Sequence, residues 1–110
     1  MKIKIKPLSV NKAHRAVNGR VIKSKDYREY EEELLWRLQP LVVPSGKLYV
    51  EYIFGVSNKL SDWDNLIKPF QDVLQKKYEF NDRDIYKAIV AKEIVKKGEE
   101  YIEFKIVSLE

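Results

Sequence analysis

The chain contains no cysteine, a single histidine and few glycines and prolines. The lack of cysteine excludes disulfide bonds, a catalytic thiolate and thiolate metal sites, and one histidine excludes a zinc site built from several imidazoles. No apolar run approaches the ~18 residues that a membrane-spanning helix needs. Lysine and isoleucine alternate over residues 2–6, which is unlike a secretory signal peptide. We therefore expect a cytoplasmic protein that does not enter a membrane.

Charge is abundant but unevenly placed. Charged residues make up 35% of the 110 residues, and the formal net charge is +4. Residues 1–25 contain many lysines and arginines but no aspartate or glutamate. Such a segment favours a polyanionic partner such as nucleic acid, although a solvated basic terminus would have the same composition.

Apolar periodicity predicts one α+β domain over residues 1–110. Helical spacing is present at about 26–38 and 65–77. Strands are expected from alternation, or from a short apolar run, at about 2–6, 47–56, 85–95 and 101–107. The order β-α-β-α-β-β predicts a small mixed sheet of about four strands, covered by two helices. A chain this short has room for one modest core, which favours oligomerisation.

Residues 7–24 form a polar segment between the first strand and the first helix. The pair Asn18-Gly19 within it is a strong signal for a tight hairpin turn. We expect a basic loop or hairpin that contacts DNA. The residues expected to make these contacts are Asn11, Lys12, His14, Arg15, Arg20 and Lys23.

An acidic motif precedes the second predicted helix. Asp62 and Asp64 stand two positions apart, so in an extended segment both carboxylates point to one side and could bind a hard divalent cation. Asp82 or Asp84, from the turn after that helix, could add a third carboxylate. Lys68 could hold a phosphate or offset charge in the transition state of phosphodiester hydrolysis.

Each of these residues also has an ordinary structural explanation. Asp64 could cap the helix or form a surface ion pair with Lys68, worth a few tenths of a kcal/mol. Trp63 is more simply a packing residue than a base-stacking one, and Asn65 more simply bonds the loop backbone. Pro69 lacks an N–H, so the helix must be distorted there or begin a residue or two later.

One nuclease family has the same order of residues. The chain resembles the RusA family of Holliday junction resolvases in Asp62-x-Asp64-Asn65-x-x-Lys68-x-x-x-Asp72-x-Leu74, followed by Asn81-Asp82. The segment Pro7-Leu8-Ser9-Val10-Asn11 is similar to that family's N-terminal Pro-Pro-Ser-x-Asn element, and the resemblance covers nearly the whole chain. The departures are Leu8 for the second proline, Trp63 for a smaller aliphatic residue, and Asn81 where the family often has aspartate.

The resemblance implies a crossover junction endodeoxyribonuclease, a hydrolase that resolves four-way junctions by symmetric paired nicks during DNA recombination and repair. It implies that Asp62, Asp64 and Asp82 are catalytic and bind Mg²⁺, with Mn²⁺ as a substitute. It also implies that Lys68 is catalytic.

The resemblance further implies supporting roles for two neighbours of these residues. Asp72 matches a recurrent acidic position of the family, with a structural role or a place next to the metal ligands, and Asn65 is also expected next to those ligands. A homodimer is also implied, because a two-fold protein suits a pseudo-two-fold junction. The alternative is a non-catalytic protein that binds branched DNA and retains a vestigial metal site.

Overall fold

A four-stranded mixed sheet organises the structure, a computed structural model that describes residues 1–110. The strands lie in the order β1-β6-β4-β5. β4 pairs antiparallel with β6 and parallel with β5, and β1 pairs antiparallel with β6. The strand bounds are Lys2–Ile3 (β1), Leu48–Val56 (β4), Ile85–Ile94 (β5) and Tyr101–Ser108 (β6). The predicted α+β fold with a four-stranded mixed sheet is confirmed.

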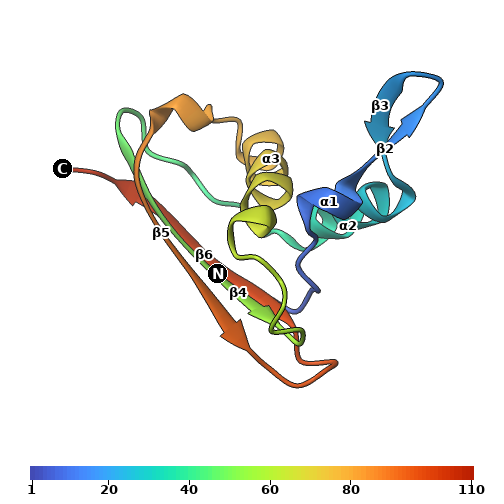
Figure 1. The fold of residues 1–110 in the computed structure, drawn as a ribbon. Coiled ribbons are helices and arrows are strands. Elements are labelled where there is room, and N and C mark those ends of the chain that lie inside the picture. The colour runs from blue at the N-terminus through green and yellow to red at the C-terminus, as the bar shows by residue number, and fades with distance from the viewer.

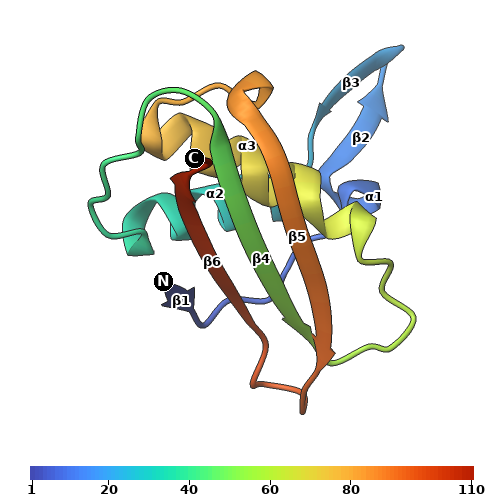
Figure 2. The ribbon, with the colours of Figure 1, turned by 90° about the vertical axis from the view of Figure 1, so that its left-hand side faces the viewer.

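Two helices, α2 (Lys25–Arg37) and α3 (Ile67–Tyr78), cover one face of this sheet (Figure 1). Figure 2 shows the other face, over which no helix passes. None of the helices is both long and apolar enough to cross a membrane.

The core lies between α3 and the covered face of the sheet, and aromatic rings form its centre. Phe70 of α3 meets the rings of Tyr52, Phe54 and Phe104 edge-on, with centroids 5.3, 5.8 and 5.6 Å apart. Edge-to-face aromatic pairs add about 0.5–1.5 kcal/mol each beyond the burial of their surface. This packing fixes α3, and therefore the side chains on its outer face, relative to β4.

The first long helix begins where the sequence predicts. Ser24 caps it, because its Oγ accepts a hydrogen bond from the backbone N–H of Tyr27 at 3.1 Å. Tyr27, Tyr30 and Leu34 are buried on one face, as their spacing predicts. The predicted range of 26–38 differs from α2 by one residue at each end.

The second long helix begins later than predicted. A 3₁₀ turn, η1 (Asp64–Leu66), comes first, and α3 starts at Ile67. Pro69 therefore lies in the first turn of α3, where its missing N–H removes no helical hydrogen bond. The side chain of Asp64 makes no capping hydrogen bond, so the prediction that it caps this helix is wrong.

The N-terminal segment differs most from expectation. β1 has only two residues, and the four-residue helix α1 (Val10–Ala13) was not predicted. The hairpin is confirmed as β2 (His14–Val17) and β3 (Arg20–Lys23), joined by Asn18 and Gly19 with φ of 50° and 75°. Positive φ at both turn residues is the feature for which Asn-Gly is favoured. The hairpin projects away from the sheet and helices (Figure 1).

Candidate functional site

The acidic motif is spread over three neighbouring segments: the loop after β4, the turn η1, and a second 3₁₀ turn, η2 (Asp82–Asp84). Asp62, Asp64 and Asp82 are all exposed, and none takes part in an ion pair. Their carboxylate oxygens are therefore open to a ligand from solvent.

A polar network on the outer face of α3 connects this helix to η2. Lys68 Nζ lies 2.8 Å from Asp72 Oδ1, one helical turn away. Gln75 Nε2 donates to the same carboxylate oxygen at 3.4 Å, and Gln75 Oε1 accepts the backbone N–H of Asp82 at 2.7 Å. The spacing of three and four residues puts Lys68, Asp72 and Gln75 on one face of the helix, in agreement with these contacts. The amide of Gln75 holds η2 beside that face.

The surroundings of Lys68 favour its protonated form. Its hydrogen bond to Asp72 raises the pKa of Lys68, partial burial opposes the rise, and the charges of Asp72 and Asp82 add to it. The charge of Asp82 acts on Lys68 although the two residues come from different elements. No hydrogen bond or ion pair joins Lys68 to Asp82, so the carboxylate acts on the lysine through its charge alone.

Asp62 belongs to a different part of the site. Asn65 Nδ2 donates to Asp62 Oδ2 at 3.3 Å, so Asn65 bonds the carboxylate rather than the loop backbone that we expected. Both residues line a cleft of about 550 Å³ between the N-terminal segment, α2 and the loop after β4. Asn11 and Lys12 line the same cleft. The cleft therefore joins one end of the acidic motif to the start of the basic segment.

Lys92 of β5 supports this loop and was missed in the sequence. Its Nζ donates to the backbone oxygens of Lys59 and Ser61, at 3.1 and 2.7 Å. It thereby fixes the loop immediately before Asp62. Alternation along residues 85–95 does place Lys92 on the covered side of the sheet, where an unpaired lysine is uncommon, and that was the available signal.

Trp63, between the two aspartates, is 53% exposed, so the expectation that it packs into the protein is wrong. An exposed indole can stack on a nucleic-acid base. Tyr27, Tyr30 and Tyr52 are buried and belong to the core.

Asp82 and Asp84, the two candidates for the third carboxylate, differ in their exposure. Asp84 is half-buried, whereas Asp82 is exposed and its charge reaches Lys68. Asp82 also acts on Tyr52, whose pKa is raised mainly by burial and further by that charge. Of the two residues, Asp82 is therefore the exposed one whose charge acts on Lys68 and Tyr52.

The donor chemistry of these residues fits magnesium. No three acidic or histidine side chains gather in an arrangement ready to hold a metal ion. Mg²⁺, however, is commonly held by one or two carboxylates, several waters and the phosphates of a substrate. Exposed, unpaired carboxylates at Asp62, Asp64 and Asp82 provide such ligands.

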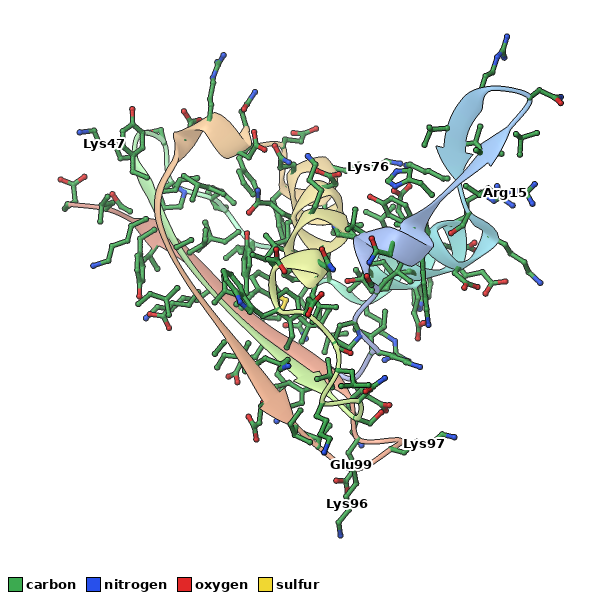
Figure 3. All side chains as sticks on the ribbon, viewed as in Figure 1. Arg15, Lys47, Lys76, Lys96, Lys97 and Glu99 are labelled. Atoms are coloured by element: carbon green, nitrogen blue, oxygen red, sulfur yellow. The ribbon has the colours of Figure 1, made fainter.

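The predicted DNA contacts divide into free and paired residues. Asn11, Lys12, His14, Arg15 and Arg20 are exposed, and none takes part in an ion pair. Figure 3 shows Arg15 beside the hairpin, pointing away from the sheet.

Lys23, the last of the predicted DNA contacts, is paired. Its Nζ lies 2.9 Å from Glu31, which also binds Lys76 of α3 at 2.8 Å. Burial acts to raise the pKa of Glu31, but the bonds from Lys76 and Lys23 outweigh it and hold this pKa below its usual range. Lys23 therefore ties the hairpin base to the helices and has less of its charge free for phosphate.

Tyr27 lies between the hairpin base and the α3 face. The ring of His14 meets it edge-on at 5.5 Å. Burial raises the pKa of Tyr27 to about 12, and the charges of Asp72 and Glu31 contribute. The phenol thus stays protonated at any physiological pH.

Comparison with known proteins adds no further assignment. No protein-family model matches the chain, and no curated protein is significantly similar to it.

Proposed function

We propose that the chain is a RusA-like, metal-dependent endonuclease that cuts branched DNA, with the four-way junction as its substrate. The observation that carries the proposal is the polar network on the outer face of α3, where Lys68 pairs with Asp72 and Gln75 binds the backbone N–H of Asp82. Asp62 and Asp64 are exposed just before this helix. These are the residues that the family resemblance implies, and they come from separate elements of the fold.

Each group has a role in this proposal. Asp62, Asp64 and Asp82 would hold Mg²⁺ or Mn²⁺, which when bound lowers the pKa of a water and offsets charge on phosphate oxygens. Lys68, kept protonated by its acidic neighbours, would bind the scissile phosphate. Asp72 and Gln75 orient the lysine and η2, and Asn65 orients Asp62.

The basic hairpin supplies affinity in this proposal. Lys12, Arg15 and Arg20 are free cations on or next to a projecting arm, which suits contact with the phosphates of a DNA arm. A homodimer would present two such arms and two sites to a four-way junction. The cytoplasmic location expected from the sequence is part of this proposal.

The test is cleavage of a labelled four-way junction in Mg²⁺ by matched carboxamide variants. Asp64→Asn and Asp82→Asn are expected to bind the junction and to lose cleavage by at least about a hundredfold, the effect of removing one group that stabilises a transition state. Asp84→Asn, a change of the same size on the same turn, should retain cleavage. Undiminished cutting by a clean preparation of Asp64→Asn would refute the assignment.

A non-catalytic protein that binds branched DNA is the second candidate. It is favoured by the absence of three carboxylates arranged to hold a metal. Retarded junction bands without product, in both Mg²⁺ and Mn²⁺ and across pH, would establish it. Comparison with forks, linear duplexes and RNA in the same assay would detect a nuclease of different substrate preference.

A further inference from the structure

The edge strand β5 has an unusually open backbone. It is ten residues long and pairs only with β4, so its outer side has no strand beside it. None of the 12 backbone hydrogen bonds outside the helices and strands involves residues 85–94. Long unpaired edges are uncommon in stable monomers, because their free N–H and C=O groups recruit other strands.

The side chains along this edge are also incompletely covered. Tyr86 is 64% exposed, Ile89 50% and Ile94 54%. No proline interrupts the strand, and the charged end of Lys92 is bound to the carbonyls of Lys59 and Ser61. A β-bulge interrupts the pairing at the start of the strand, between Ile85 and Lys87, but residues 87–94 pair regularly with β4 and their outer edge is open.

The sequence of β5 is complementary to itself. A two-fold axis perpendicular to the sheet would pair two copies antiparallel and keep both open faces on one side. Side chains directly opposite each other then share a face, so odd-numbered residues must pair with odd-numbered ones. With the axis at Val90, Lys87 stands opposite Glu93 of the second copy, and this pair occurs twice.

The remaining pairs in that register are compatible. Ile89 stands opposite Ala91 on each side of the axis, which covers part of the exposed apolar surface. Tyr86 lies in the bulge at the start of β5, outside this regular register. Shifting the axis by one residue, to Ile89, places Lys87 against Ala91 and Glu93 against Ile85, and the charge complementarity is lost. Opposite charges directly across an antiparallel pair are stabilising, and like charges are destabilising.

We propose that β5 is the interface between two copies of this chain, which pair antiparallel about Val90 into one continuous sheet. Lys87 lies near the ring of Tyr49 and Glu93 accepts a hydrogen bond from Tyr101, and both side chains are exposed on the open face. These contacts hold the two charges over the open face beside the edge. The proposal concerns the edge alone and does not depend on nuclease activity.

Charge reversal tests this register, with sedimentation velocity of the full chain in the absence of DNA and metal. Wild type is expected to be a dimer. Lys87→Glu and Glu93→Lys each place like charges opposite one another twice, and each should raise the dimer Kd by roughly tenfold or more. An equimolar mixture of the two variants restores both attractive pairs and should form a heterodimer.

Two controls keep the test specific. Lys97→Glu and Glu99→Lys make the same charge changes in the turn before β6, far from the β5 centre (Figure 3), and should leave the dimer intact. Thermal unfolding of each variant identifies any that fails to fold, which matters for Glu93→Lys because it loses the bond from Tyr101. A monomeric wild type, dimers unaffected by both reversals, or a mixture that does not reassociate would each overturn the proposal.

Discussion

Removing the three free cations of the hairpin region should flatten the salt dependence of DNA binding. Lys12, Arg15 and Arg20 are exposed and unpaired, so each is available to one phosphate. Each phosphate neutralised on duplex DNA contributes about 0.9 to the slope of log K against log salt. The triple alanine variant should therefore lose about 2.7 from that slope.

The effect is large enough to measure directly. A slope difference of about 2.7 means that a fourfold rise in salt weakens wild type about 40-fold more than the variant. The assay is fluorescence anisotropy with a labelled four-way junction in EDTA, so that no strand is cut during the titration. Substitutions of exposed residues usually change the free energy of unfolding by less than about 0.5 kcal/mol, so the triple variant should remain folded during the assay.

A matched control separates position from charge. Lys47, Lys96 and Lys97 lie at other extremities of the molecule (Figure 3). Changing them to alanine also takes the formal charge from +4 to +1, because three positive charges are removed. An unchanged slope in the hairpin variant, or an equal loss in the control, would refute DNA contact by this hairpin.

Three further predictions concern stability, measured as the free energy of unfolding in urea. Ser24→Ala should cost about 1–2 kcal/mol, since Oγ caps α2 and also donates to the carbonyl of Lys12; wild-type stability would show that neither bond matters. Gly55→Ala should cost about 1–3 kcal/mol, because a Cβ there overlaps the ring of Tyr101; an unaltered midpoint would contradict this close packing. The pKa of Glu31 is lowered on folding, so its carboxylate stabilises the fold above the unfolded value of 4.5 and this contribution is lost as the pH falls through the folded pKa. Glu31→Gln should therefore be less stable than wild type at neutral pH and reach parity in acid, and a difference that does not vary with pH would contradict the ion pairs.

The parts of the fold with strong periodicity could be predicted from the sequence. The alternation of β4, the helical spacing of α2 and the Asn18-Gly19 turn each correspond to an element whose local preference and burial agree. The helix α1 was missed because four residues carry too little periodicity to distinguish a helix from a loop. Pro69 predicts a late start of α3, but nothing in the sequence predicts the 3₁₀ turn before it.

The sequence suggests which residues belong to the candidate site, but it does not contain their contacts. Which aspartate's charge acts on Lys68 depends on how α3 packs against β4 through Phe70 and Tyr52. This packing is a long-range arrangement that no local sequence pattern contains. The exposure of Trp63 and the bond from Lys92 to the Ser61 carbonyl depend on the path of the loop after β4, which no local sequence pattern contains either.

Asp72 and Asp82, the two acids whose charges act on Lys68, differ in their hydrogen bonds. Oδ1 of Asp72 already accepts from Lys68 and Gln75, so this carboxylate is engaged within the protein. Asp82 is held to Gln75 only through its backbone N–H, which leaves its own carboxylate exposed and unpaired. Because Lys68 is fixed by Asp72, it does not form an ion pair with Asp82 and neutralise it. A ligand that carries positive charge would therefore find Asp82 available, while a phosphate would find the remaining donors of Lys68.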